Sequence, residues 1–295
     1  MERKSTKVLV TLCCILALVL TFSLSKLWQQ SNIEQVSNEI EKKVVRTEST
    51  ELVDSIHAYL NEKGIAEADV GLSIRSLDGY ETYSINGDDE FIAASVYKLP
   101  LAMIWYEKVN NGEVSLEDTL YYDSYHYEEG PGVPLMYSPG ANIPIQTLLE
   151  TMIQLSDNTA GHILFENLGG WASFKEMAAS YTDRVMDPLF FSNDNYLTAN
   201  YMGDVIQYIV DHKDSFSKLI SDMKISVPDN YLNLHLPEST AQKYGSFDKA
   251  ENAAGFVEGS KIPYSIVVFT DLGVPGIEVI GDINQLCFEY FNKEA

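Results

Sequence analysis

The sequence predicts an α+β domain: an antiparallel sheet of about five strands, flanked by N- and C-terminal helices, with an all-helical lobe inserted between the strands. Apolar and polar residues alternate on both sides of Asp78-Gly79, which predicts a β-hairpin over residues 70–87. Strand-like patterns return near the C-terminus, at about 240–247, 251–259 and 263–273. The pattern of residues 95–236 is mostly helical.

The flanking helices are predicted at the two ends of this domain. A stripe of apolar residues from Leu52 to Leu60 predicts a helix that begins at Glu51 and stops at Gly64. Residues 281–293 predict the last helix, and no strand is expected between the hairpin and the C-terminal strands. Because the sheet comes from both ends and the helices from the middle, we expect two lobes with a ligand site between them.

The N-terminal region differs in kind from the rest of the chain. Three cations precede an uncharged apolar run, Val8–Ser25, which as a helix would span roughly 27 Å. The positive charges predict a cytoplasmic N-terminus and an extracytoplasmic domain. We interpret residues 1–26 as a membrane anchor, with a cleaved signal peptide as the alternative. Residues 27–50 are polar and predict a stalk, and residues 51–295 form the folded domain.

Composition excludes several classes of function. The chain has 20 Lys and Arg against 43 Asp and Glu, a formal charge of -23, and such a surface repels nucleic acid. Cys13 and Cys14 lie in the apolar run, so Cys287 has no partner for a disulfide within the exported domain. The histidines are scattered and no H-E-x-x-H motif occurs, so we expect neither a metal nor another cofactor. We expect a monomer that acts on a small molecule or a peptide.

A serine and a lysine stand three residues apart at the start of the apolar segment "FIAASVYKLPLAMIWY". On a helix, Ser95 and Lys98 would share a face. A serine hydroxyl needs a nearby base to act as a nucleophile, and burial can lower a lysine pKa enough to provide one. The alternative is an N-cap serine beside a solvated lysine. The same spacing recurs in polar contexts at Ser215/Lys218, Ser221/Lys224 and Ser246/Lys249.

Two further motifs accompany this pair. Ser156-Asp157-Asn158 ends an apolar stretch, and Lys243-Tyr244-Gly245 lies on a predicted strand. In motif order and approximate spacing, the chain resembles the class A β-lactamases and related penicillin-recognising serine transferases, whose motifs are S-x-x-K, S-D-N and K-T-G. The resemblance covers roughly residues 50–292 and implies the β-lactamase/transpeptidase-like fold. Residues 137–139 and 168–170 are similar to further landmarks of that family.

The resemblance implies catalytic roles for three residues. Ser95 would be the acylated nucleophile, Lys98 its proton acceptor, and Ser156 the hydroxyl that passes a proton to the leaving amine. The backbone N–H groups of Ser95 and Ser246 would form the oxyanion hole.

It also implies residues that bind the ligand. Asn158 would hold the acylamino carbonyl and touch Lys98, and Lys243 would keep Ser156 poised and attract the substrate carboxylate. Gly245 would let the strand backbone approach the ligand. Tyr137 would line the cleft rim, and Asp157 would be structural.

Three departures from the family pattern bear on hydrolysis. Tyr244 stands in place of threonine, and no E-x-x-L-N stretch, whose glutamate activates the deacylating water, occurs between the second and third motifs. His162 stands where the family has an asparagine that braces this glutamate. Asp187, Asp194 and His162 are the candidates for a substitute base. For the two aspartates, a turn-forming role is the alternative.

Acylation of Ser95 by a β-lactam or an acyl-D-Ala-type peptide is therefore expected, whereas the motifs do not predict rapid hydrolysis of the acyl-enzyme. The alternative is a membrane-tethered protein that binds penicillin or senses the cell wall without hydrolysis. The segment 121–132 gathers tyrosines, two glutamates and His126. It predicts an aromatic surface loop over the helical lobe, with carbohydrate or peptide contact as the alternative.

Overall fold

The computed structural model describes residues 26, 28, 30, 50–236 and 240–293. The chain divides into two compact units, Met1–Ser49 and Thr50–Ala295, and the second contains the helices and strands considered below. Within the described residues, no helix has the length and apolar character needed to cross a membrane. Of the predicted anchor, residues 1–26, only Lys26 is among them; its apolar run Val8–Ser25 lies outside, as does most of the predicted stalk.

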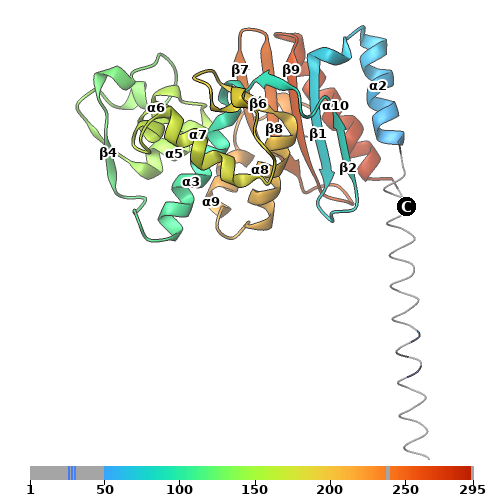
Figure 1. Ribbon diagram of the computed structural model, residues 1–295, viewed down its shortest axis with the longest axis horizontal. Helices are drawn as coiled ribbons and strands as arrows, with labels where there is room; N and C mark the ends of the chain where they lie inside the picture. The colour runs from blue at the N-terminus through green and yellow to red at the C-terminus, as the bar shows by residue number, and fades with distance from the viewer. Residues whose placement is uncertain (1–25, 27, 29, 31–49, 237–239, 294–295) are drawn as a thin grey trace, which may run out of the picture. The chain divides into compact units, whose positions relative to one another are not determined.

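The predicted five-stranded antiparallel sheet is confirmed (Figure 1). Its strands are β1 Val70–Ser76, β2 Thr82–Ile85, β7 Thr240–Phe247, β8 Ala250–Val257 and β9 Tyr264–Asp271. Their order is β2-β1-β9-β8-β7, so the N-terminal hairpin pairs with the last strand. This order leaves β7 at one edge of the sheet, beside the segment that carries Ser95.

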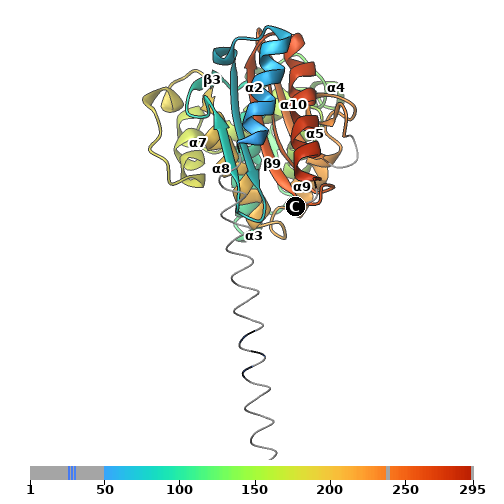
Figure 2. The same ribbon diagram turned by 90° about the vertical axis from the view of Figure 1, so that its right-hand side faces the viewer.

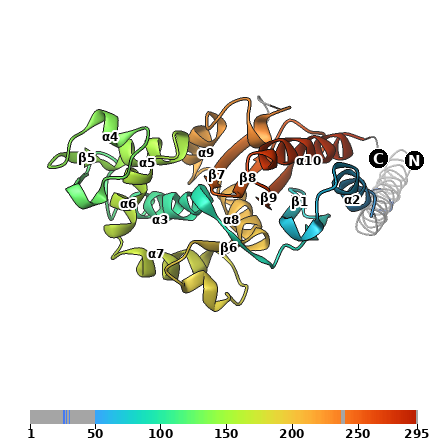
Figure 3. The ribbon, with the colours of Figure 1, turned by 90° about the horizontal axis from the view of Figure 1, so that it is seen from above.

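The two faces of the sheet are covered by different helices. These are α2 Glu51–Lys63 and α10 Pro275–Phe291 on one face, and α8 Ala199–Asp211 on the other. Figure 2 shows α2 and α10 side by side, and Figure 3 shows α8 and α10 on opposite sides of the sheet. α10 begins six residues before the predicted start at Gly281, because Pro275 is tolerated in a first helical turn.

Alternate residues of β9 belong to two separate cores. Ile266 and Val268 pack in the cluster of α2 and α10, whereas Val267 and Phe269 pack in the cluster of α8 and the helical lobe. Successive side chains of a strand point to opposite faces, and here both faces are buried. The uninterrupted apolar run in this strand therefore reflects burial on both sides.

The helical lobe lies beside the sheet, as predicted (Figure 1). Its helices are α3 Lys98–Asn110, α4 Val133–Met136, α5 Ile145–Gln154, α6 Asn158–Glu166, α7 Trp171–Ala178 and α9 Ser217–Lys224. Every residue of α3 from Lys98 to Tyr106 is buried. A helix that is apolar on all sides lies inside a core, so α3 is the central helix of this lobe and Lys98 begins it.

The prediction that no strand lies between the hairpin and the C-terminal strands is wrong. Two small sheets occur there, β3 Glu90–Ile92 paired with β6 Tyr196–Thr198, and β4 Thr119–Tyr121 paired with β5 Asn142–Pro144. Three-residue strands are too short for an alternating pattern to be detected. Short 3-10 helices complete the described fold: η1 Glu67–Asp69, η2 Ala94–Tyr97, η3 Ser124–His126, η4 Ala179–Tyr181, η5 Pro188–Phe191 and η6 Tyr231–Asn233.

Candidate active site

Ser95 lies in η2, immediately before α3 begins at Lys98. Side chains three residues apart eclipse in a 3-10 helix, so this turn aligns Ser95 with Lys98. Ala94 has a φ of 48°, a left-handed conformation that is strained for alanine. Asn195, next to β6, holds the turn: its side chain donates to the Ala94 carbonyl at 2.6 Å, and its own carbonyl accepts from Ala93 N at 2.8 Å. The pairing of β3 with β6 thus fixes the approach to Ser95.

Lys98 is fully buried and joins two helices of the lobe. Its Nζ lies 3.0 Å from Ser95 Oγ, 2.7 Å from the Ser156 carbonyl oxygen and 2.6 Å from Asn158 Oδ1. The last two oxygens can only accept hydrogen bonds. They therefore occupy both N–H groups of an uncharged amine and leave its lone pair for the Ser95 hydroxyl. This geometry suits proton transfer from Ser95 to Lys98.

Ser156, Asp157 and Asn158 lie where α5 and α6 meet. Ser156 has a φ of 59°, the second strained position in the site. The buried Asp157 carboxylate accepts from Val133 N at 2.6 Å and from Ala160 N at 3.2 Å, so it caps α6. Asp157 therefore has a structural role: by capping α6, it fixes the position of Asn158, the first residue of that helix.

β7 brings the third motif against η2. A Cβ atom on Gly245 would lie 2.6 Å from Ser95 N and 3.0 Å from the Ala93 carbonyl oxygen. Only glycine lets the strand come this close to the serine turn. Ser246 follows and lines the same cavity as Ser95, while its hydroxyl donates to Glu251 at 2.8 Å.

The contacts of Lys243 differ from those that the resemblance implies. Among the described residues, its Nζ donates to the carbonyl oxygen of Tyr244 at 2.8 Å rather than to Ser156. The Ser156 side chain influences the pKa of the Tyr244 phenol, so the two side chains lie near each other, and the Tyr244 ring packs against Tyr231 with 4.9 Å between centroids. The tyrosine at this position therefore adds a phenol to the surroundings of Ser156.

Burial determines the charge of the two lysines. It lowers the pKa of Lys98 to about 7, against the opposing effect of the Asp157 and Glu128 carboxylates. Burial, together with the charge of Lys98, lowers the pKa of Lys243 well below its usual range. Because burial disfavours its ammonium form, uncharged Lys98 is available near neutral pH as a proton acceptor.

A cavity of about 380 Å³ opens onto these groups. Ser95, Asn158 and Ser246 line it, whereas Lys98 and Lys243 are fully buried. Tyr137, the expected rim residue, packs against the core of the helical lobe and is not among the residues that line the cavity. Tyr137 directly follows the short helix α4, whose four residues carry no periodic pattern from which the sequence could have placed it.

The three candidates for a substitute base lie in different environments. Asp194 lines the cavity on an exposed loop. The Asp187 side chain accepts a hydrogen bond from Leu189 N at 2.8 Å, which is the turn-forming role given above as its alternative. It also lines a different cavity. His162 lies in α6 with its Nδ1 3.5 Å from Glu128 Oε1.

Glu128 was not among the residues predicted for the site, but the structure places it in the cavity lining. It belongs to the segment 121–132, which the sequence predicts as a surface loop. The only signal in the sequence was the pair of glutamates in that loop, and no local pattern could show that one of them reaches the cavity.

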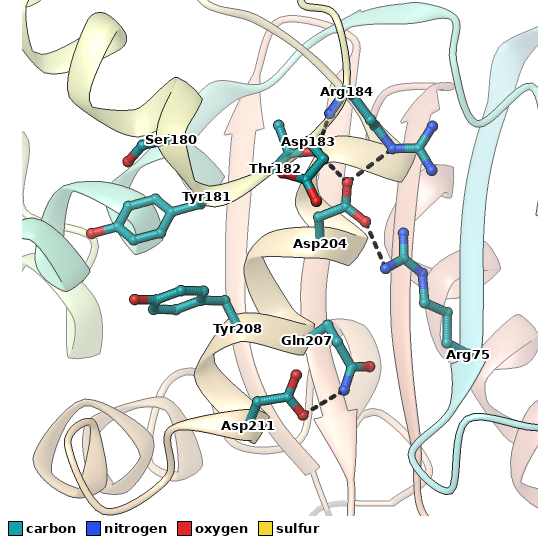
Figure 4. A pocket seen from close by; sticks show the side chains of 10 residues that line it. All are labelled: Arg75, Ser180, Tyr181, Thr182, Asp183, Arg184, Asp204, Gln207, Tyr208 and Asp211. Carbon is teal, nitrogen blue, oxygen red and sulfur yellow. Dashed lines mark hydrogen bonds and ion pairs between the residues drawn. The ribbon is translucent and has the colours of Figure 1, made fainter.

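A second, larger cavity of about 610 Å³ lies elsewhere, between β1, α8 and the segment 180–184 (Figure 4). Arg75 and Arg184 both contact the Asp204 carboxylate, at 2.7 and 2.9 Å. None of the three motifs lines this cavity. Its arginines already have a carboxylate partner, so these contacts join the sheet to α8 and the loop.

The fold and the site together define the class of the protein. An α+β fold with a Ser-x-x-Lys turn, a Ser-Asp-Asn connection and a Lys-x-Gly edge strand gathered at one place is that of the penicillin-recognising serine hydrolases. The chain belongs to the Beta-lactamase enzyme family, whose family model matches residues 51–291.

Individual relatives are more distant. The chain is 31% identical over 117 residues to the extended-spectrum beta-lactamase PER-1 of Pseudomonas aeruginosa, a match that covers 39% of this chain and 38% of that protein. The matched part is thus well under half of this relative.

Solved structures share the fold over a greater length. An acyl-enzyme complex of a PBP-A mutant with penicillin G superposes with a TM-score of 0.72 at 21% identity, covering 83% of this chain and 97% of that chain. A beta-lactamase from Sphaerobacter thermophilus gives a TM-score of 0.69 at 24% identity, covering 82% and 97%. At these identities, the likeness shows a common fold.

Proposed function

We propose that this chain is an extracytoplasmic serine hydrolase of the class A β-lactamase type, acylated at Ser95 by β-lactams or by acyl-D-Ala-type peptides. The proposal depends above all on one observation, the position of the Lys98 amine 3.0 Å from Ser95 Oγ. The two short contacts of Lys98 to Ser156 O and Asn158 Oδ1 support it, because they orient the amine as a proton acceptor.

In the proposed acylation, Ser95 Oγ bonds to the carbonyl carbon of the lactam while its proton passes to Lys98. The backbone N–H groups of Ser95 and Ser246 would bind the oxyanion. As the carbon–nitrogen bond breaks, the proton would reach the leaving nitrogen through Ser156, whose Oγ lies 3.5 Å from Lys98 Nζ. The product is an ester on Ser95, and the amine that leaves the carbonyl carbon remains part of the opened lactam.

The same site offers groups for the other polar parts of such a substrate. The Asn158 side chain lines the cavity and would hold an acylamino carbonyl. A substrate carboxylate beside the buried Lys243 would favour the charged form of that lysine. The names of the similar proteins, beta-lactamases and a penicillin G acyl-enzyme, support a β-lactam as the acylating substrate.

The alternative function is penicillin binding or cell-wall sensing without hydrolysis. One observation favours it: the segment 184–195 has no E-x-x-L-N glutamate, and Asp187 in that segment caps η5. An acyl-enzyme without a deacylating base would accumulate. The two functions share acylation and differ in the second step.

A fluorescent penicillin tests the shared step. We expect wild-type protein to retain the label through denaturation and Ser95→Ala to lose it. Ser221→Ala is the matched control, because Ser221 begins another Ser-x-x-Lys sequence but donates its hydroxyl within its own helix, to the Ser217 carbonyl. Labelling of Ser95→Ala at the wild-type rate would refute the assignment. Turnover of nitrocefin then separates a hydrolase from a protein that remains acylated.

The extracytoplasmic location is part of the proposal and depends on the sequence alone. Cations before the apolar run Val8–Ser25 support a tethered domain outside the cytoplasm. Protease digestion of intact cells tests it: a domain outside the cytoplasm is degraded by added protease, whereas a domain that survives until lysis contradicts the proposed location.

A further inference from the structure

The cavity that contains Ser95 also contains a carboxylate from an unexpected element. Glu128 comes from the loop between η3 and α4, and it lines the same cavity as Ser95 and Asn158. If the proposed acylation occurs, hydrolysis of the resulting ester needs a group that removes a proton from water. Glu128 and Asp194 are the two carboxylates among the described residues that line this cavity.

The backbone of Glu128 is fixed to the second motif. Its N–H donates to Thr159 Oγ1 at 2.9 Å, and the same hydroxyl donates to its carbonyl oxygen at 3.0 Å. Thr159 is completely buried and directly follows Asn158 in α6. The loop therefore holds Glu128 at a constant position relative to Asn158, although the side chain itself is about half exposed.

His162 faces the carboxylate from the same helix. It lies four residues after Asn158 in α6, and its Nδ1 is 3.5 Å from Glu128 Oε1. The His126 ring lies beside it, with 5.2 Å between the ring centroids. The His162 imidazole thus lies next to a carboxylate that comes from another loop. This contact connects two departures from the family pattern, the histidine at position 162 and the absence of the E-x-x-L-N glutamate.

Asp194 lacks this environment. Like Glu128 it is exposed, but its backbone N–H and carbonyl bond to Ser192, its neighbour in the same loop. The charge of Glu128 also opposes the effect of burial on the pKa of Lys98, whose amine lies 3.0 Å from Ser95 Oγ. With its backbone fixed to Thr159 and His162 at its side, Glu128 is the stronger candidate of the two carboxylates.

We propose that Glu128 is the general base of deacylation and that His162 is its positioning residue. Glu128 takes a proton from a water molecule as the water oxygen bonds to the ester carbon. When the tetrahedral intermediate collapses, the bond to Ser95 Oγ breaks and the proton returns from Glu128 to that oxygen. The products are a carboxylic acid and the free Ser95 hydroxyl. A glutamate from a different loop thus performs the step for which the sequence lacks the E-x-x-L-N glutamate.

The test measures the two steps separately in the full chain with a fluorescent penicillin. For Glu128→Gln, we expect labelling of Ser95 at a rate within about twofold of wild type, and loss of the label slowed by about a hundredfold or more. Glu129→Gln is the matched control, since it makes the same change at an exposed neighbour and should release the label as wild type does. For Glu128→Ala, added formate should restore release, which a purely structural role would not allow. For His162→Ala, slower release with unchanged labelling is expected.

Several results would overturn the proposal. One is release of the label from Glu128→Gln at the wild-type rate. Another is slow release from Asp194→Asn in its place, and a third is loss of labelling in a folded Glu128→Gln. The first two outcomes concern release of the label and leave the acylation of Ser95 unaffected. The third concerns acylation, which the labelling rate measures separately. The proposal also fails if wild-type protein never releases its label, because there is then no deacylation for Glu128 to catalyse. Failure of wild-type protein to label at all would refute the proposed function and this inference together.

Discussion

Gly245 on the edge strand lies in direct contact with the backbone of Ser95, so close that a Cβ atom at position 245 would be 2.6 Å from the serine nitrogen. The nitrogen is one of the two donors proposed for the oxyanion hole. The contact between strand and turn thus sets the distance between the helical lobe and the sheet at the point where the substrate carbonyl would lie.

Replacing this glycine should affect acylation more than folding. In Gly245→Ala, the methyl group must push η2 and β7 apart, which costs about 1–3 kcal/mol in stability and displaces an oxyanion donor. We expect labelling of Ser95 by fluorescent penicillin to slow by about a hundredfold. Gly64→Ala is the control: its φ of 70° makes alanine strained, but nothing lies within 4 Å of a Cβ there. It should lose stability without slower labelling.

The rate of acylation should depend on pH through Lys98. Burial lowers the pKa of this amine to about 7, and only the uncharged form can accept the Ser95 proton. The uncharged fraction grows as pH rises through the pKa, so the labelling rate should increase with pH, reach half its maximum near pH 7 and level off above it. Lys98→Arg stays charged and should lose at least about a hundredfold in rate. A rate that is constant or falls with pH would exclude Lys98 as the acceptor.

Tyr244 provides a further test, because it stands where the family has threonine and its phenol lies near the Ser156 side chain. Tyr244→Phe keeps the ring packed on Tyr231 but removes the hydroxyl, so we expect acylation about tenfold slower through poorer orientation of Ser156. Tyr231→Phe removes the neighbouring hydroxyl, which donates to Glu251 at 2.7 Å. It should lower stability and leave the labelling rate unchanged. Equal labelling by both variants would show that the contact to Ser156 has no catalytic effect.

Asp157 should matter for stability. Asp157→Ala removes the acceptor for the buried Val133 and Ala160 N–H groups, which should lower the free energy of unfolding by about 2–3 kcal/mol in urea denaturation. Asp187→Ala removes the cap of an exposed 3-10 turn and should cost about 1 kcal/mol or less. A loss for Asp157→Ala no greater than that for Asp187→Ala would contradict the buried capping role.

The long strands and helices could be predicted because each one carries its own pattern. The eight residues of β9 and the hairpin at Asp78-Gly79 are long enough to show burial and turn chemistry locally. The small sheets β3–β6 and β4–β5 could not be predicted, because each strand has three residues and its partner is remote in sequence. The same limit applies to Tyr137, which was expected at the cleft rim and lies half-buried against the core of the helical lobe instead.

By itself, the sequence determined the class of fold and the residues of the three motifs, because hydrophobic periodicity and short motifs are local properties. Only the tertiary structure decided which side chains meet. It gave Lys98 its two acceptors, turned the Lys243 amine to the Tyr244 carbonyl, and brought Glu128 from a loop that the sequence left on the surface. These contacts join residues far apart in the chain, and their distances depend on how the two lobes pack, which no local pattern encodes.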